Sequence, residues 1–275
     1  MTAHITQETV AMAREMTYAA GRQLRDFQGH AAHKSKGFRD YVSEADLASE
    51  SVLLQAIAAR YPEHGILSEE SGKSSPGDSD YLWIIDPLDG TSNYLWGIPV
   101  SVVSVALAFR GQVEMGIVYD PWREEMIWGW QGHGVRLNEQ PVHVTDRSTL
   151  GDCIVGTDFG YRGERIDVTA AMARSLLDKV TGLRAFSAGA LTLAYVACGR
   201  LDAYFNFGFS TWDMAAGAFL ASEAGGRSTN LRGGPAYLTT KGCLATNGHI
   251  HQEILDVWQQ EGIYEHSPAF AAMPV

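Results

Sequence analysis

Residues 83–93 read Trp83-Ile84-Ile85-Asp86-Pro87-Leu88-Asp89-Gly90-Thr91-Ser92-Asn93, an apolar run that ends in two aspartates and a glycine. The run predicts a strand over 81–85, and Asp86 and Asp89 follow at its carboxyl end, where both can face a crevice beyond the sheet. Carboxylates held this close repel each other unless a cation lies between them. Oxygen ligands suit Mg²⁺ or Mn²⁺ better than softer metals. The segment therefore predicts a metal site at the edge of a sheet.

The residues after the second aspartate are suited to a tight turn. Gly90 can adopt a backbone conformation closed to other residues, and Thr91 and Ser92 offer hydroxyls and backbone N–H groups that could bind a phosphate if a helix begins there. The alternative is an Asx-type turn, in which the aspartates only hydrogen-bond nearby backbone. Taken alone, the motif favours this simpler interpretation.

Other acidic segments favour the metal site. Glu69 and Glu70 end a predicted strand over 65–68, and only one of them can face the site because neighbouring strand residues point to opposite sides. Asp213 begins a predicted helix over 213–224, with a plain helix cap as the alternative role. Asp46 lies in the first turn of a helix that Ser43 is expected to cap.

The order of predicted helices and strands changes near residue 145. Before it, two helices and a meander of strands over 102–109, 113–119 and 126–130 predict an α+β sub-domain spanning 1–145. After it, strands and helices alternate, which predicts an α/β sub-domain over 146–265 that supplies Asp213 and substrate contacts. We expect a ligand cleft at the joint and a frayed tail over 266–275.

Composition narrows the function classes. The 275 residues carry 21 Lys and Arg against 32 Asp and Glu, a net charge of −11, with 45% hydrophobic residues, which predicts a folded protein and disfavours nucleic acid as the main partner. The longest apolar stretch, 98–109, is too short to span a membrane, and the first residues show no secretory signal, so we expect a cytoplasmic protein. We expect reduced cysteines and no zinc site, with His249 and His251 at the surface.

Taken together, these motifs resemble the inositol monophosphatase-like family of Mg²⁺-dependent, lithium-sensitive sugar phosphatases. The resemblance rests on residues 83–93, on Trp212-Asp213-Met214-Ala215-Ala216-Gly217 and on Glu223-Ala224-Gly225-Gly226, with weaker matches at 42–46, 68–71 and 116–121. It implies a layered αβαβα sandwich, a homodimer, and hydrolysis of a small phosphate monoester by metal-activated water. It also implies two or three Mg²⁺ ions in each active site, with Mn²⁺ as a possible substitute.

The resemblance also implies roles for individual residues. Glu69, Asp86 and the Leu88 carbonyl would hold one cation, Asp86, Asp89 and Asp213 a second, and Glu69 a weaker third. The residues with catalytic roles would be Glu69, Thr91 and Asp46, of which the last two orient or deprotonate the attacking water. Gly90, Thr91 and Ser92 would receive the phosphate. Contacts to the rest of the substrate would come from Asp89, Gly189, Ala190, Leu191 and Asn206.

The sequence departs from the family pattern in places that bear on the substrate. Ser68 replaces a glycine, and Asn206 replaces an acidic residue that contacts inositol hydroxyls in the inositol-specific members. The candidate substrates are therefore inositol monophosphate or a related sugar or polyol phosphate, histidinol phosphate, fructose bisphosphate and nucleotide 3′-phosphates. A non-catalytic protein that binds metal and sugar phosphate is the alternative from another class. Lys36 either lies on a mobile loop over the metals, as in the family, or belongs to a solvated loop.

Overall fold

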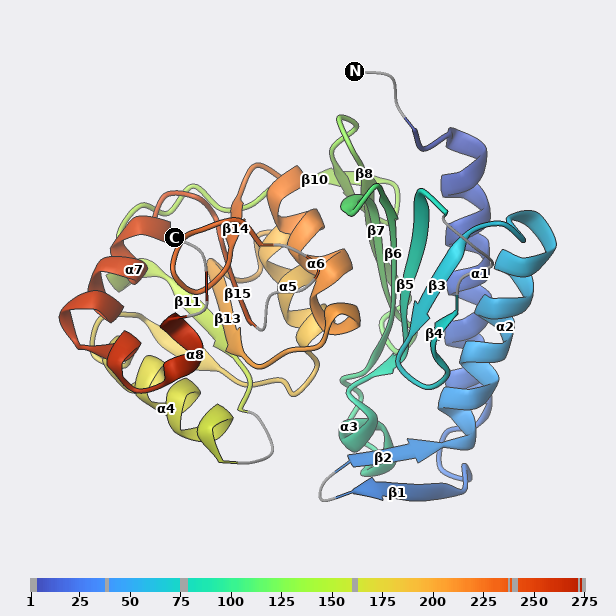
Figure 1. Cartoon of the computed structure of the whole chain (residues 1–275), viewed down its shortest axis with the longest axis horizontal. Coiled ribbons are helices and arrows are strands. Elements are labelled where there is room, and N and C mark those ends of the chain that lie inside the picture. Colours follow the sequence, from blue (N-terminus) through green and yellow to red (C-terminus); the bar gives the residue numbers. More distant parts are fainter. Residues whose placement is uncertain are drawn as a thin grey trace.

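Two β-sheets alternate with three helical layers in the computed structural model of the chain (Figure 1). The structure describes residues 4–37, 40–74, 79–159, 163–236, 238, 242–271 and 273. Helices α1 (Gln7–Asp26) and α2 (Glu44–Arg60) cover the outer face of the larger sheet. Helices α5 (Gly189–Ala197) and α6 (Thr211–Glu223) lie between the sheets, and α4 (Glu164–Leu176) and α7 (His251–Gln260) cover the far side. This is the layered αβαβα sandwich that the sequence predicts.

The larger sheet has eight strands in the order β10-β9-β8-β7-β6-β5-β3-β4. Their bounds are β3 Gly65–Ser68, β4 Gly72–Ser74, β5 Tyr81–Asp89, β6 Val102–Phe109, β7 Gln112–Asp120, β8 Glu125–Trp130, β9 Val135–Leu137 and β10 Gln140–Val142. The predicted meander is confirmed, because β6, β7 and β8 pair antiparallel in succession. Along β5, Trp83 and Ile85 pack against α1 and α2 while Ile84 packs toward α5 and α6, so the strand is buried on both faces.

Strand β5 is longer than the sequence predicts, and this extension positions the acidic motif. Asp86 pairs with Ser104 and Asp89 pairs with Val102, with an irregularity in the register between them. The strand therefore runs through Pro87 instead of ending at Ile85. Proline is tolerated here because the pairing is interrupted where its missing N–H would otherwise be needed.

The smaller sheet has five strands in the order β12-β11-β13-β15-β14. Their bounds are β11 Ile154–Thr157, β12 Gly182–Arg184, β13 Ala203–Phe207, β14 Arg227–Thr229 and β15 Gly242–Thr246. Small residues bring α6 close to both of its neighbours. A Cβ at Gly217 would lie 2.4 Å from Leu193 Cβ of α5, and one at Gly116 would lie 2.8 Å from the Ala216 carbonyl oxygen. The shared middle layer thus fixes the position of α6, which carries Asp213.

The expectation of a frayed tail over 266–275 is wrong in the described residues. Pro268–Ala271 forms a short helix, α8, and Phe270 is fully buried with its ring 5.2 Å from that of Phe207, so this part of the chain is not a frayed tail. The segment after Glu70 forms β4, which pairs with β3; residues 75–78 lie outside the described part. None of the helices in the described ranges is both long and apolar enough to cross a bilayer.

His251 is fully buried, whereas the sequence placed it at the surface. Its Nδ1 lies 3.0 Å from Thr246 Oγ1 and its Nε2 lies 3.0 Å from Thr229 Oγ1, so both ring nitrogens have neutral hydroxyl partners. Burial, with a smaller effect of Arg227, lowers the pKa of His251 to about 4. The exposed His249 is where the sequence placed it.

The His251→Gln variant is expected to make stability less dependent on pH. The unfolded chain protonates His251 near its usual pKa while the folded chain keeps it neutral, so the wild type loses stability as pH falls below about 6.5, by on the order of 3 kcal/mol near pH 4. Urea unfolding of wild type and variant between pH 7 and 4.5 measures how steeply the free energy of unfolding changes with pH. His249→Gln is the control, and equal slopes for wild type and His251→Gln would contradict the prediction.

Candidate active site

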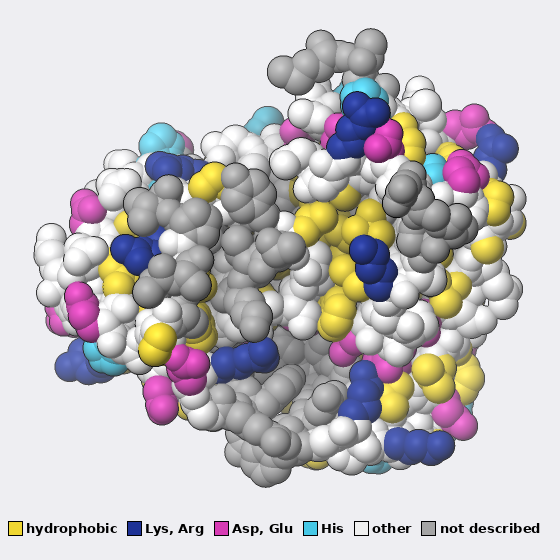
Figure 2. Space-filling view, viewed as in Figure 1, with side chains coloured by type: hydrophobic (Ala, Val, Ile, Leu, Met, Phe, Trp, Pro, Cys, Tyr) yellow, Lys and Arg dark blue, Asp and Glu magenta, His cyan; other side chains and the backbone are white. Residues whose placement is uncertain are grey.

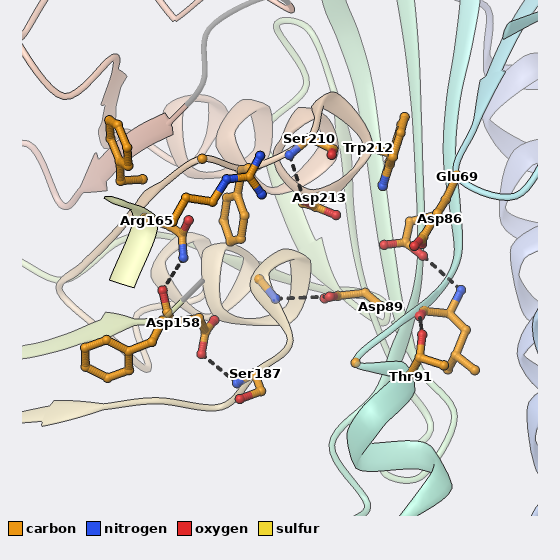
Figure 3. Close-up of a pocket in the computed structure, with 18 residues that line it drawn as sticks. Glu69, Asp86, Asp89, Thr91, Asp158, Arg165, Ser187, Ser210, Trp212 and Asp213 are labelled. Carbon is orange, nitrogen blue, oxygen red and sulfur yellow. Dashed lines mark hydrogen bonds between the residues drawn. The ribbon is translucent and has the colours of Figure 1, made fainter. Parts of the chain in front are cut away.

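A pocket of about 300 Å³ opens where the ends of β3 and β5 meet α5, α6 and the ends of β11 and β13 (Figure 3). Its lining comes from both halves of the chain, from residues 69–91 and from residues 158–213. Eighteen described residues line it: Glu69, Asp86, Leu88, Asp89, Gly90, Thr91, Asp158, Phe159, Arg165, Ser187, Gly189, Asn206, Phe207, Gly208, Phe209, Ser210, Trp212 and Asp213. Four of the carboxylates predicted from the sequence therefore face one space.

Glu69 lies next to Asp86 because β3 pairs parallel with β5. Ser68 is in register with Ile85, and the Glu69 N–H donates to the Ile85 carbonyl oxygen at 3.2 Å. Asp86 is 1% exposed and accepts the Leu88 N–H at 3.0 Å. Glu69 lines the pocket and Glu70 does not, as expected for neighbouring residues at a strand end.

Glu70 instead pairs with a lysine from a hairpin of β1 (His33–Gly37) and β2 (Asp40–Ser43). Lys36 Nζ lies 2.6 Å from a Glu70 oxygen and 3.8 Å from a Glu69 oxygen. Lys36 is thus part of a strand beside the acidic cluster. Residues 38 and 39, between the two strands, lie outside the described residues.

Asp89 joins the two halves of the chain. One of its oxygens accepts the Gly189 N–H at 3.1 Å and the other accepts the Ala190 N–H at 2.8 Å, with Leu191 N at 3.4 Å, all in the first turn of α5. A carboxylate is favourable at this end of a helix dipole. Of the three α5 residues expected to contact substrate, only Gly189 lines the pocket. Ala190 and Leu191 are buried in the core, so they act on the site through Asp89.

Asp213 and Asp46 occupy equivalent positions in two capping boxes. The Ser210 N–H donates to Asp213 at 2.8 Å at the start of α6, and the Ser43 N–H donates to Asp46 at 2.8 Å at the start of α2. The helix-capping alternative for Asp213 is therefore real, yet the same side chain also lines the pocket. The spacing Ser-x-x-Asp could have identified both boxes in the sequence.

Thr91 connects Asp46 to the pocket. Its hydroxyl lies 3.0 Å from the Leu88 carbonyl oxygen and 3.4 Å from Asp46 Oδ1. Asp46 is fully buried and is not among the lining residues, and burial raises its pKa to about 6. Any effect of Asp46 on a ligand in the pocket therefore passes through Thr91.

Helix α3 (Thr91–Leu95) begins at the predicted phosphate-binding turn but has only five residues. Gly90 and Thr91 line the pocket, whereas Ser92 does not. Asn93, which the sequence did not single out, donates to the carbonyl oxygens of Val100 at 2.8 Å and Phe186 at 2.7 Å. It thereby fixes the turn against the second half of the chain.

Gly90→Ala is expected to lower the free energy of unfolding by about 2–4 kcal/mol. Gly90 has φ +88, and a Cβ there would lie 2.8 Å from the Val100 carbonyl oxygen, so the variant has both backbone strain and a steric overlap. Gly97→Ala is the matched control, because Gly97 has φ +72 but a Cβ at that position would have no neighbouring atom within 4 Å. Urea unfolding compares the two, and an equal loss in both variants would refute the overlap.

The pocket carboxylates are poorly compensated by charge. Burial and then the charge of Asp213 raise the pKa of Glu69 to about 7, and burial raises the pKa of Asp213 to about 6. Burial and neighbouring carboxylates also raise the pKa values of Asp86 and Asp89 well above their usual range. Excess negative charge of this kind, on oxygen donors only, fits divalent cations such as Mg²⁺.

The described acidic side chains of the pocket do not surround a single point. No three Asp, Glu, His or Cys side chains among the described residues converge into a ready-made coordination shell. The fit to a metal therefore rests on the kind of donors that face the pocket and on their uncompensated charge. The Leu88 carbonyl, which also lines the pocket, adds a neutral oxygen to this set.

Two charged residues of the pocket were missed in the sequence. Asp158 follows β11, is 7% exposed, and accepts the Ser187 N–H at 2.6 Å and the Tyr204 hydroxyl at 2.8 Å. Its place after a strand of the second sheet is the same signal that identified Asp86. Arg165, near the start of α4, has no comparable sequence signal. Asn206, predicted to contact substrate, does line the pocket, and its side-chain amide donates to the Asp158 carbonyl oxygen.

Comparisons with known proteins identify the family of the chain. The model of the inositol monophosphatase family matches residues 2–262. The chain is 38% identical over 251 residues to the inositol-1-monophosphatase of Synechocystis sp., which covers 90% of this chain and 88% of that protein. It is 40% identical over 229 residues to the Nus factor SuhB of Pseudomonas aeruginosa, which covers 82% of this chain and 84% of that protein.

Solved structures give the same result. The extragenic suppressor protein suhB from Bartonella henselae superposes with a TM-score of 0.88 at 33% identity, over 92% of this chain and 99% of that one. Inositol monophosphatase from Anabaena superposes with a TM-score of 0.82 at 36% identity, over 97% and 99%. The chain belongs to the inositol monophosphatase family.

Proposed function

We propose that the protein catalyses Mg²⁺-dependent hydrolysis of a small phosphate monoester. The observation that carries this proposal is that Glu69, Asp86, Asp89 and Asp213, from three distant segments, face one pocket beside Thr91. A purely structural set of carboxylates would be expected to pair with Lys or Arg. Here Arg165 is the one basic side chain among the described lining residues, and Lys36, which lies outside that lining, reaches only Glu69 of the four, at 3.8 Å.

The ligands divide into overlapping sets. Glu69, Asp86 and the Leu88 carbonyl would hold one cation, Asp86, Asp89 and Asp213 would hold a second, and Glu69 would contribute to a weaker third; Mn²⁺ would be able to replace Mg²⁺. Bound Mg²⁺ neutralises phosphate charge and lowers the pKa of a coordinated water. The carboxylates would orient the substrate phosphate through the cations, because they determine where the positive charge of the cations lies in the pocket.

The neutral groups of the turn act on phosphate and water. Backbone N–H groups of Gly90 and Thr91, which line the pocket, donate to the phosphate oxygens, and Ser92 follows them in α3. Thr91 has one hydroxyl hydrogen, which the Leu88 carbonyl and Asp46 share in this structure. In the reaction we assign it to Asp46, which leaves the Thr91 lone pairs to accept a hydrogen bond from the attacking water and aim it.

The leaving alcohol belongs to inositol monophosphate or a related sugar or polyol phosphate, and the relative named inositol-1-monophosphatase supports this class. Histidinol phosphate, fructose bisphosphate and nucleotide 3′-phosphates are the alternatives. Asn206 and Gly189 border the space for the alcohol. A homodimer, inhibition by lithium and a cytoplasmic location are part of the same proposal, and all three derive from the family resemblance or from composition.

Phosphate release from a panel of these monoesters tests the proposal. The wild type is expected to release phosphate in Mg²⁺ from at least one class, and to release none after chelation with EDTA. Restoration by added Mg²⁺ shows that the loss is reversible. Absence of release from every monoester would favour the non-catalytic alternative.

A second candidate function comes from the names of several relatives, which are called Nus factor SuhB. A role as a Nus factor would not need hydrolysis of a phosphate ester. The net charge of −11 disfavours direct binding to nucleic acid, and on the described part of the face in Figure 2 Lys and Arg are dispersed among Asp and Glu. The exclusion of nucleic acid nevertheless stays a prediction, because several relatives of this chain are named Nus factors. Copurification of RNA polymerase with both the wild type and an inactive Asp213→Asn variant would support this second function.

A further inference from the structure

We infer that Arg165 binds a second phosphate group on the substrate, and that the pocket therefore prefers bisphosphorylated compounds over the matching monophosphates. The inference rests on the proposed phosphatase function and names the substrate class for it. It starts from the position of Arg165 among the lining residues, where it is the one side chain in the described pocket with a permanent positive charge.

Arg165 faces Glu69 and Asp86 from the opposite wall of the pocket. Figure 3 shows it on the side of Asp213 and Ser210, across the pocket from Glu69 and Thr91. A substrate whose reacting phosphate lies on the Gly90–Thr91 turn would extend its other end toward this guanidinium.

The donors of Arg165 are available to a ligand. None of the ion pairs found among the described residues includes it, although nine other Lys and Arg residues are so engaged. A guanidinium offers a planar fork of donors that matches a phosphate in two-point contact. An exposed arginine without such a partner would ordinarily be free to turn away into water.

The backbone at Gly208 lies against the arginine side chain. A Cβ at Gly208 would lie 2.6 Å from Arg165 Nε and 2.7 Å from its Cδ, so the stem lies directly on this glycine. Gly208 follows β13 and precedes Ser210 and Asp213 in the same connection. Arg165 is thus positioned against the segment that delivers a proposed metal ligand.

The remaining polar groups beside Arg165 do not oppose a second anion strongly. Asn206 is neutral, and its amide is already engaged by the Asp158 carbonyl oxygen. The Asp158 carboxylate is nearly buried and accepts hydrogen bonds at both oxygens, from the Ser187 N–H and the Tyr204 hydroxyl. Burial also raises its pKa to about 6, which favours its neutral form more than for an ordinary aspartate.

The test compares substrates that differ by one phosphate. Fructose 1,6-bisphosphate is paired with fructose 1-phosphate, and adenosine 3′,5′-bisphosphate with adenosine 3′-monophosphate, so that a sugar and a nucleoside carrier are distinguished. For at least one pair, the wild type is expected to show a higher kcat/KM for the bisphosphate. In Arg165→Gln the ratio of the two kcat/KM values should fall tenfold to a hundredfold, as for loss of a charged hydrogen-bonded pair.

Three comparisons make the test specific. Arg174→Gln removes the same charge from the exposed last turn of α4 and should leave the ratio unchanged. Arg165→Lys keeps the charge without the fork and should give an intermediate ratio. Gly208→Ala should lower the ratio with no change in charge, because it displaces the arginine stem. Gly208 also has φ +94, so the variant strains the backbone, and its kcat/KM for the monophosphate measures that effect separately.

The outcomes separate this inference from the proposed function. The inference alone would be overturned if the wild type released phosphate from monophosphates and Arg165→Gln left the ratio of the two kcat/KM values unaltered. An equal loss of kcat/KM on both members of each pair would have the same meaning. Failure of the wild type to release phosphate from every compound in Mg²⁺ would overturn the proposed function and the inference with it.

Discussion

Asp213→Asn is expected to lower kcat/KM for phosphate release by about 10³-fold or more. The substitution keeps the size of the side chain and an oxygen that can accept the Ser210 N–H, so α6 retains its capping partner. What it removes is one negative charge from the proposed second metal site. Loss of charge stabilisation at a catalytic metal centre costs several kcal/mol in the transition state, and about 4 kcal/mol corresponds to a factor near 10³.

The same variant is expected to be more stable than the wild type in EDTA. Asp213 raises the pKa values of Glu69, Asp86 and Asp89 by its charge, so its neutral replacement relieves repulsion in the folded state. A gain of about 1–2 kcal/mol would raise Tm by a few degrees in a chain of this size. Added Mg²⁺ should raise the Tm of the wild type by mass action and should raise that of the variant much less.

The Tm in EDTA and the change of Tm on addition of Mg²⁺ together identify a metal ligand. If Asp213 only capped α6, its replacement by Asn would not raise Tm in EDTA and would leave the Mg²⁺ effect intact. Asp178→Asn is the matched control, because Asp178 is 71% exposed and lies outside the pocket. Normal turnover by Asp213→Asn would show that the site has been assigned to the wrong residues.

The parts of the site that could be predicted share one signal, an acidic residue at the end of an apolar segment. Asp86 and Glu69 have this signal, and their parallel strands do bring them together. The signal was present for Asp158 as well, after the strand Ile154–Thr157, but no second motif accompanied it in the sequence. Strand ends are informative because adjacent parallel strands deliver them to one edge.

Other parts could not be predicted because they depend on packing between the two halves. Asp89 caps α5 about a hundred residues away, so Ala190 and Leu191 are buried where substrate contacts were expected. Arg165 enters the pocket only because Gly208 leaves room for its stem. His251 was misassigned for a related reason: polar neighbours in sequence suggested solvent, while Thr229 and Thr246 supply its partners from neighbouring strands.

Replacement of Thr91 by Val is expected to lower kcat by about 10²–10³-fold with little change in KM. Valine keeps the shape of the side chain but has no hydroxyl to aim the attacking water, and a positioned proton-transfer group contributes roughly 10²–10⁴-fold. Thr91→Ser retains the hydroxyl and should keep most of the activity. A loss of kcat in the serine variant as large as in the valine variant would point to packing as the role of Thr91.

A double-mutant cycle with Asp46 tests whether the two residues act as one unit. Asp46 is fully buried and reaches the pocket through the Thr91 hydroxyl, 3.4 Å from its Oδ1. Asp46→Asn should therefore lower kcat in the wild type but have little further effect once Thr91 is Val, as expected for groups in one hydrogen-bonded chain. Additive losses would mean that Asp46 affects the reaction by another route, for which its contacts with Ser43 at the start of α2 are the available path.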